Sequence, residues 1–343
     1  MVLGAASLGN GETPAMQRIA NRTIACHAVE SLATAGIDDV AVVAPPDAID
    51  EVRDCVENDL VDGVLPTYLP QDDRLDLLGA LRAAAEFVGD DRAVVHLADG
   101  LLGQQLDQIT DLLHETAPDM LLLLHRSETG HDGLGPATQR LLGVTELNGT
   151  PTRLALAGVC VFGPGMLQRA ADVGAELQSD IDLLQIAEQL AADGHVLEAV
   201  VVRGWRRYQG DPLDLLELNR VVLDQVHPQG ELLHRGDNRI EGRVIIDPSA
   251  VVDSSIILGP CIIGPNAHVS NSYIGPYTAI GAGADIEGAE IVRSIICEGA
   301  QIKHISGRIE GSTIGRRAAI FRDFRLPRAM RLHVGEDVEV ALQ

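Results

Sequence analysis

Aliphatic residues recur at every sixth position over much of the last third of this chain. The series is Val251, Ile257, Ile263 and Val269 and then, after a slip of one residue, Ile274, Ile280, Ile286 and Val292. An α-helix repeats every 3.6 residues and a β-strand every two, so neither produces a period of six. Small residues, Gly, Pro, Ser, Ala and Asn, fill the positions between. The period predicts hexapeptide coils, and we expect a left-handed parallel β-helix over residues 240–343.

The first two thirds of the chain follow a different pattern. Short apolar runs at 40–45, 93–99, 119–125, 154–162 and 196–202 alternate with helical periodicity at 25–36, 76–89, 179–194 and 212–226. Alternation of this kind indicates an α/β fold whose sheet is covered on both faces. We therefore predict a doubly wound, mixed-sheet, Rossmann-like domain over residues 1–230. Its ligand crevice is expected at the carboxyl ends of the strands.

Composition limits the partners of such a chain. Fifty acidic residues against 26 basic ones give a formal charge of −24, which repels nucleic acid and anionic lipid. Lys303 is the only lysine, and the five cysteines form no C-x-x-C pair. That cysteine usage argues against a zinc site or a disulfide framework. With no apolar run of spanning length, we expect a cytoplasmic protein that contacts neither membrane nor nucleic acid.

Several stretches together resemble the sugar-phosphate nucleotidylyltransferases, in particular the long form of the glucose-1-phosphate thymidylyltransferases. They are "ANRTIACHAVESLATAGIDDVAVV", "LPQDDRLDLLGALRAAAEFVGDDRAVVHLADGLL", "GWRRYQGDPLDLLELNRVVLD" and, in the repeat region, "YIGPYTAIG". The resemblance covers nearly the whole chain. It implies a nucleotidyltransferase domain followed by a β-helix. It also implies a reaction in which a sugar 1-phosphate attacks a nucleoside triphosphate bridged by Mg²⁺.

The resemblance assigns nucleotide-binding and metal roles to five positions. Gly4, Gly9 and Gly11 lie in a shortened glycine loop that could offer backbone amides to an anion. Gln71 matches the glutamine that reads the base, and Asp99 matches the first magnesium aspartate.

Other family positions carry unexpected residues. Tyr208 stands where the second magnesium aspartate belongs, which weakens any Mg²⁺ site, and Leu147 stands where the family has the sugar-phosphate lysine. The loop arginine and the lysine after it have no counterpart. Three positions remain as sugar-binding candidates: Glu146, Gly158 and Asp180.

The missing cations favour a homologue that no longer makes a nucleotide sugar. Phosphoryl transfer depends on cancelling developing charge, so losing these groups together removes most of the means of catalysis. We expect a non-catalytic, regulatory or repurposed member of a modified-sugar or secondary-metabolite pathway. It would bind a sugar phosphate or nucleotide sugar and form a homo-oligomer, or a hetero-oligomer with an active paralogue. The alternative is an active enzyme that forms a nucleotide-linked sugar or cyclitol using Asp99, with Arg18 and Arg22 as phosphate clamps.

Several histidines could in principle supply other chemistry. His27 and His96 are expected to be buried structural residues, and His96 does not share a strand face with Asp99. His268 and His304 lie in the repeat region, where some hexapeptide enzymes carry an acyltransferase base. Only the fold favours that activity, and fold alone does not establish function.

Overall fold

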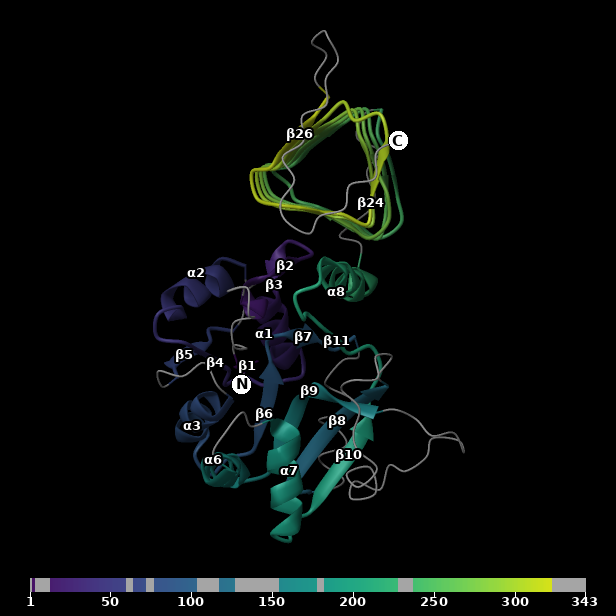
Figure 1. Cartoon of the computed structure of the whole chain (residues 1–343). Coiled ribbons are helices and arrows are strands. Elements are labelled where there is room, and N and C mark those ends of the chain that lie inside the picture. The colour runs from purple at the N-terminus through teal and green to yellow at the C-terminus, as the bar shows by residue number, and fades with distance from the viewer. Residues whose placement is uncertain are drawn as a thin grey trace, which may run out of the picture.

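The computed structural model describes residues 2–3, 13–59, 64–71, 77–103, 117–126, 154–177, 182–227 and 237–322. An α/β part and a three-sided solenoid lie side by side, with helix α8 (Pro212–Gln225) and a short hairpin between them (Figure 1). Of the helices in these ranges, none is long and apolar enough to cross a membrane.

Seven strands of the described α/β part form one mixed sheet in the order β10-β8-β9-β6-β1-β4-β5. All its neighbouring pairs are parallel except the two made by β9, which is antiparallel to β6 and β8. The bounds are β1 Val2–Leu3, β4 Ala41–Ala44, β5 Thr67–Pro70, β6 Ala93–Leu97, β8 Met120–Arg126, β9 Leu154–Phe162 and β10 Leu197–Val201. The predicted mixed α/β sheet is therefore confirmed.

Helices cover both faces of this sheet because its strands are apolar on both sides. Val42, Leu121 and Leu123 face one buried cluster, while Val43 and Leu122 face the other. The first cluster includes residues of α1, α2 and α8, and the second includes residues of α3, α6 and α7. The bounds not yet given are η1 Pro14–Met16, α1 Ile24–Thr34, α2 Ile49–Asp59, α3 Leu77–Val88, α6 Met166–Leu177 and α7 Leu183–Ala192.

The solenoid confirms the predicted parallel β-helix. Its described strands form three five-stranded parallel sheets, one for each side of the triangle in Figure 1. The first sheet holds β12 Arg239–Glu241, β15 Ile256–Leu258, β18 Tyr273–Ile274, β21 Glu290–Val292 and β24 Arg308–Glu310. The second holds β13 Val244–Ile246, β16 Cys261–Ile263, β19 Thr278–Ile280, β22 Ile295–Ile296 and β25 Thr313–Ile314. The third holds β14 Val251–Asp253, β17 His268–Ser270, β20 Asp285–Glu287, β23 Gln301–Lys303 and β26 Ala319–Phe321.

Two members of the predicted inward column were wrong by one residue. Val251 is 55% exposed, and the residue beside it, Val252, packs on the core instead. Likewise Ile291 is fully buried where Val292 was expected. The one-residue slip recurs at the corner between the third and first sheets, so these positions fall out of a strict period of six. Because side chains alternate along a strand, a slip of one residue exchanges inside for outside.

A hairpin and helix α8 connect the two parts. The hairpin pairs β2 (Arg18–Ile19) with β3 (Arg22–Thr23). Fully buried Asn219 of α8 accepts a hydrogen bond from the Ala20 backbone N–H at 2.9 Å and donates one to the Tyr277 carbonyl at 3.0 Å. From the hairpin, Asn21 donates to the Ile280 carbonyl at 2.7 Å. Both amide groups therefore tie the α/β part to the second sheet of the solenoid.

Candidate functional site

The candidate site lies at the carboxyl edge of four neighbouring strands. Strands β6, β1, β4 and β5 are parallel and adjacent, so their carboxyl ends meet at one edge. Asp99 follows β6 by two residues, Gln71 follows β5 directly, and the glycine loop follows β1. Such an edge is where ligands bind in doubly wound sheets. The topology thus brings the ends of three predicted site segments to one edge. Gln71 itself is buried, and its backbone N–H donates to the Ala44 carbonyl at 3.0 Å.

Asp99 is buried and paired with an arginine. The carboxylate is 2% exposed, and its Oδ2 accepts a hydrogen bond from Nε of Arg207 at 2.5 Å. The Arg207 side chain is 52% exposed, and among the described residues it makes no other ion pair or hydrogen bond. In the part of the chain that the structure describes, no residue occupies its outer guanidinium nitrogens. The second oxygen, Oδ1 of Asp99, is buried without a hydrogen-bond partner in the described part of the chain.

The electrostatics of Asp99 follow from this burial. Loss of water raises the pKa of the Asp99 carboxyl above its usual value, and the Arg207 guanidinium offsets only part of that rise. The charged carboxylate therefore depends on Arg207 as its counterion. A buried carboxylate that loses its only cationic partner is strongly disfavoured.

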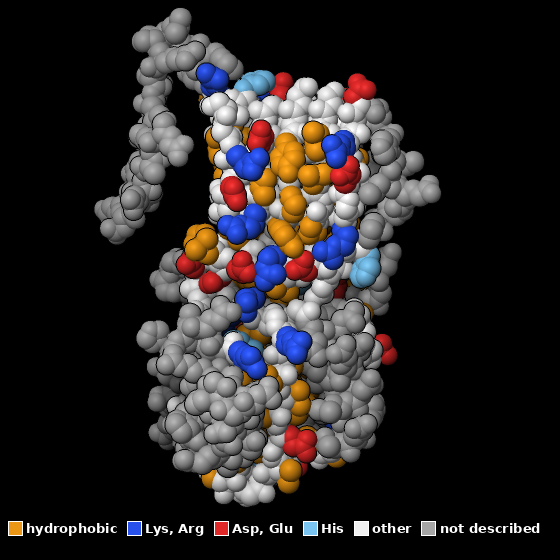
Figure 2. All heavy atoms as spheres, turned by 90° about the vertical axis from the view of Figure 1, so that its right-hand side faces the viewer, with side chains coloured by type: hydrophobic (Ala, Val, Ile, Leu, Met, Phe, Trp, Pro, Cys, Tyr) orange, Lys and Arg blue, Asp and Glu red, His pale blue; other side chains and the backbone are white. Residues whose placement is uncertain are grey.

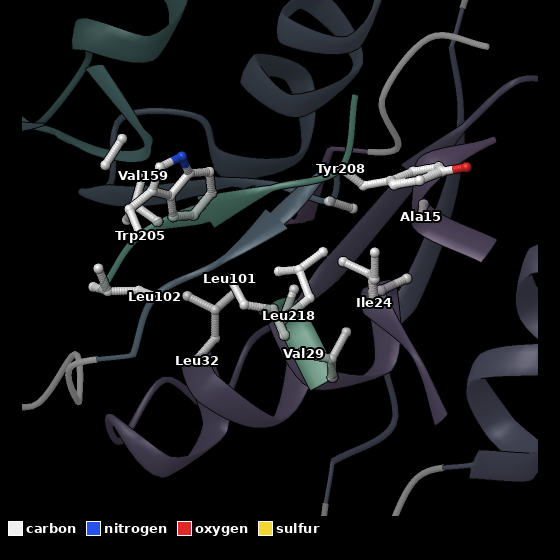
Figure 3. Close-up of a cluster of buried hydrophobic side chains, with 14 of the residues drawn as sticks. Ala15, Ile24, Val29, Leu32, Leu101, Leu102, Val159, Trp205, Tyr208 and Leu218 are labelled. Atoms are coloured by element: carbon white, nitrogen blue, oxygen red, sulfur yellow. The ribbon is translucent and has the colours of Figure 1, made fainter. Parts of the chain in front are cut away.

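The position predicted for the second magnesium ligand lies beside Asp99. Strand β11 (Arg206–Arg207) pairs antiparallel with β7 (Gly100–Leu101), and the Tyr208 N–H donates to the Asp99 carbonyl at 2.7 Å. Figure 3 shows the Tyr208 ring lying toward Ala15 in the buried hydrophobic cluster. The phenol ring therefore packs in the core.

The described residues do not fit a magnesium site. Mg²⁺ needs oxygen ligands in near-octahedral geometry. Here the one candidate carboxylate binds a guanidinium, and the neighbouring position holds a buried phenol. Within the described ranges, no three His, Cys, Asp or Glu side chains gather as metal ligands. The structure thus places a fixed positive charge, that of Arg207, on the aspartate predicted to hold the metal.

The two arginines considered as phosphate clamps are held in local contacts. Arg22 forms an ion pair with Glu30 on helix α1. Arg18 donates from Nη2 to the Asn21 carbonyl at 2.7 Å, which closes the hairpin turn. Both belong to the hairpin that meets the solenoid, and the charge of Arg18 also acts on Cys297 there. Arg18 therefore acts within the hairpin at the junction between the two parts, and Arg22 ties that hairpin to helix α1.

Gly158 lies under the only tryptophan of the chain. A Cβ at Gly158 would stand 2.6 Å from Cζ2 and 2.7 Å from Cη2 of Trp205, and a Cβ at Gly100 would stand 2.7 Å from Cζ2. The indole thus packs closely against the backbones of both glycines, and its ring centroid is 5.9 Å from that of His96. This contact explains why glycine is needed at position 158. That Gly158 also binds a sugar stays a prediction.

Some predicted residues lie outside the described ranges. These are Gly4, Gly9 and Gly11 of the loop, and the sugar-binding candidates Glu146 and Asp180.

The two histidines expected to be structural are enclosed to different degrees. His96 is fully buried and His27 is partly buried, and desolvation lowers the pKa of each to about 4. Nε2 of His27 lies 3.0 Å from the Ile19 carbonyl, and Nδ1 of His96 lies 2.9 Å from the Leu97 carbonyl.

Sequence reasoning missed Arg207. The signal was present, because two arginines precede Tyr208 in "GWRRYQG". Because Arg207 directly precedes Tyr208, the position where the metal aspartate is missing, the sequence already suggested that its charge could replace that of the metal.

Comparisons with known proteins agree on one family. The nucleotidyl transferase family model matches residues 9–225. A glucose-1-phosphate thymidylyltransferase of Streptomyces antibioticus is 30% identical over 330 residues, covering 95% of this chain and 92% of the relative. A low-salt glycan biosynthesis nucleotidyltransferase of Haloferax volcanii is 30% identical over 334 residues, covering 94% and 92%.

A solved structure supports the fold. A Bacillus anthracis protein assigned as a glucose-1-phosphate thymidylyltransferase, crystallised with sucrose, superposes with a TM-score of 0.54 at 18% identity. The match covers 67% of this chain and 96% of that one.

Proposed function

This chain belongs to the nucleotidyl transferase family, and from that premise we propose that it is a non-catalytic member. In this proposal it binds a sugar phosphate or nucleotide sugar in the inherited crevice. It acts as a regulatory or repurposed protein of a modified-sugar pathway, alone or beside an active paralogue.

The ion pair between Asp99 and Arg207 carries the proposal. In nucleotidyl transfer a divalent cation bridges the phosphates and withdraws charge as pyrophosphate leaves. A guanidinium can bind a phosphate through its N–H groups, but it cannot supply the open coordination positions of a metal. Because Nε of Arg207 bonds Oδ2 of Asp99, a magnesium ion at this carboxylate would lie beside a fixed guanidinium charge, and only Oδ1 is left without a partner among the described residues. The site is therefore better suited to binding a phosphate group than to activating it for nucleotidyl transfer.

The contacts of the other candidate cations support the same conclusion. Arg22 is engaged by Glu30, and Arg18 closes the hairpin at the solenoid junction. Each guanidinium is thus already oriented by a local partner, with which a phosphate would have to compete.

The decisive experiment measures pyrophosphate release. Purified protein is incubated with Mg²⁺, glucose 1-phosphate and each nucleoside triphosphate, beside an active thymidylyltransferase as a positive control. We expect no turnover above a protein-free blank. Sustained release would refute the proposal and favour the active alternative that uses Asp99, Arg18 and Arg22.

Variants at the site make the test sharper. Y208D returns one carboxylate but leaves Arg207 on Asp99, so we expect no activity. Y208D/R207A frees both carboxylates, and we expect it to gain magnesium-dependent thermal stabilisation that Y208D lacks. Equal stabilisation of the two variants by Mg²⁺ would contradict the assignment of Arg207 as the group that blocks the metal.

A ligand-binding test addresses the retained crevice. We expect nucleoside diphosphate sugars to raise the melting temperature equally with Mg²⁺ and with a chelator, because Arg207 supplies the local positive charge. A shift seen only with Mg²⁺ would show that a metal still mediates binding.

A further inference from the structure

The hairpin between β2 and β3 has an unusual turn. Its two connecting residues, Ala20 and Asn21, have φ values of +44° and +69°. A two-residue hairpin loop with both φ angles positive is typical of the type I′ turn, which favours Asn and Gly. Asparagine tolerates this left-handed region, but the Cβ of an alanine crowds the backbone there. Ala20 is therefore strained, and such strain persists only where the surrounding structure holds it.

Each residue of this turn is bonded to a segment far away in the sequence. The Ala20 N–H donates to Oδ1 of Asn219 on α8 at 2.9 Å, and Nδ2 of Asn21 donates to the Ile280 carbonyl of the solenoid at 2.7 Å. Ala20 is 2% exposed, so water competes little for its N–H. The strain of a left-handed alanine and the net stabilisation by one or two hydrogen bonds are of similar size. The turn therefore depends on these bonds.

The solenoid surface that receives the turn is shaped for it. A Cβ at Gly264 would stand 3.0 Å from Nδ2 of Asn21 and 3.0 Å from the Ile280 carbonyl oxygen, so glycine leaves room for the amide. In the corner before β19, the Tyr277 carbonyl accepts a hydrogen bond from Nδ2 of Asn219 at 3.0 Å. The two asparagines thus reach neighbouring carbonyl groups of the same coil.

Charged side chains hold α8 against the same face of the solenoid. The Asp224 carboxylate of α8 accepts a hydrogen bond from the Tyr277 hydroxyl at 3.0 Å, and the same oxygen lies 3.3 Å from Nη2 of Arg243. Arg220 of α8 donates to the other Asp224 oxygen at 3.2 Å. Figure 2 shows acidic and basic side chains gathered where the solenoid meets the α/β part. Helix α8 and the solenoid therefore form a single support for the hairpin.

Both supported segments lead to the candidate site. Helix η1 directly precedes the hairpin, and Figure 3 shows its Ala15 beside the Tyr208 ring. The Tyr208 N–H donates to the Asp99 carbonyl at 2.7 Å. On the other side, α8 begins at Pro212, shortly after Tyr208 in the sequence. A shift of the hairpin or of α8 thus reaches Asp99 and Arg207 through few contacts.

We propose that the solenoid positions the candidate site for its ligand by holding the Ala20–Asn21 turn in its strained form. Asn21 and Asn219 act as positioning residues. When the bond from Asn21 to Ile280 is lost, the turn relaxes and η1 loses its place beside Tyr208. Docking of the solenoid and binding of the ligand are then coupled equilibria. The effect on the ligand rests on the proposed function, whereas the effect on the geometry of the site does not.

Two substitutions separate the hydrogen bond from the strain. N21G removes the bond to Ile280 and keeps a residue that adopts a positive φ readily. A20G keeps both bonds and removes the strain. N271G is the matched control, because Asn271 is exposed and has a φ of +47° in the corner between the third and first sheets, whereas the hairpin contacts the second sheet.

Amide hydrogen exchange on the full-length protein without ligand tests the positioning. We expect N21G to accelerate exchange roughly threefold to tenfold in peptides covering residues 13–19 and 205–209, as the loss of one hydrogen bond predicts. N271G should leave these peptides unchanged. A20G/N21G should exchange like the wild type, because a turn without strain no longer depends on the bond. Exchange in N21G equal to that of the wild type overturns the proposal, and so does equal acceleration in N21G and A20G/N21G.

Binding of dTDP-glucose, measured by isothermal titration calorimetry, tests the link to the ligand. N21G should raise the dissociation constant roughly threefold to tenfold, N271G should leave it unchanged, and A20G/N21G should restore it. This rescue distinguishes positioning from a merely structural loss, because the double variant still lacks the Asn21 amide. Unchanged affinity in N21G overturns the coupling. A wild type that does not bind dTDP-glucose contradicts the proposed function instead, and the exchange experiment then decides the positioning by itself.

Discussion

Replacing Gly158 by alanine tests the packing that holds the candidate site together. Gly158 lies in the inner strand β9, where the indole of Trp205 leaves no room for a Cβ. Trp205 begins the segment that carries Arg207 to Asp99, so the position of this ring and the geometry of the site are coupled through a few residues of backbone.

The magnitude follows from the distances. An added methyl would lie 2.6 Å from Cζ2 of Trp205, about an ångström inside normal contact between carbons. The ring has little room to retreat, because Trp205 is buried and also packs against Gly100. Overpacking of this kind lowers the free energy of unfolding by about 1–3 kcal/mol. Alanine offsets up to about 1 kcal/mol of that loss, because it restricts the conformational freedom of the unfolded chain more than glycine does. We expect G158A to lower the free energy of unfolding by about 2 kcal/mol.

Urea unfolding provides the assay. Trp205 is the only tryptophan, so intrinsic fluorescence reports on this site alone, while far-UV circular dichroism follows the whole chain. G315A is the matched control, since a Cβ at Gly315 would meet no described atom within 4 Å. We expect G315A to leave the stability within about 0.5 kcal/mol of the wild type.

A double-mutant cycle can refute the reasoning. W205F removes Cζ2 and Cη2, the two atoms that the added methyl would strike. G158A should therefore cost less than half as much in the W205F background, measured by circular dichroism. An equal cost in both backgrounds would show that the indole contact is not the cause.

Three further predictions follow from buried groups. R207A leaves the buried Asp99 carboxylate without its counterion and should lower the free energy of unfolding by about 1–3 kcal/mol. The loss is smaller than for a fully buried pair because Arg207 is half exposed. D99N/R207A should recover most of this stability, measured by urea unfolding. Burial lowers the pKa of His27 and His96 from 6.5 to about 4, so each takes up a proton on unfolding between these values. Their contribution to stability should be complete above pH 7 and lost as the pH falls from 6.5 toward 4, by up to about 1.4 kcal/mol per pH unit for each histidine. H96N should reduce that slope, and a slope unchanged in H96N would contradict a neutral buried imidazole. N219A leaves the Ala20 N–H and the Tyr277 carbonyl unpaired at the junction and should lower the free energy of unfolding by about 2–3 kcal/mol. In calorimetry, the α/β part and the solenoid should then unfold in separate transitions. A single unchanged transition would argue against a bridging role of Asn219.

The sequence predicted the elements whose periodicity was strong. The strand at Leu154–Phe162 was predicted with its observed bounds, and the long helical patterns gave helices within a few residues. The hexapeptide period predicted the solenoid, but a fixed period could not track the shorter corner before the first sheet. Val251 was therefore assigned to the wrong side of its strand.

The sequence by itself determined that an α/β sheet precedes a β-helix, because local periodicity fixes which residues must be buried. The tertiary structure added the strand at Thr67–Pro70 and the strand order that brings the ends of β1, β5 and β6 to one edge. Only the tertiary structure decided which cation reaches Asp99. Arg206 and Arg207 are adjacent on β11 and point to opposite faces, so the antiparallel register with β7 selects Arg207. That register arises from contacts between segments about a hundred residues apart, which no local pattern in the chain encodes.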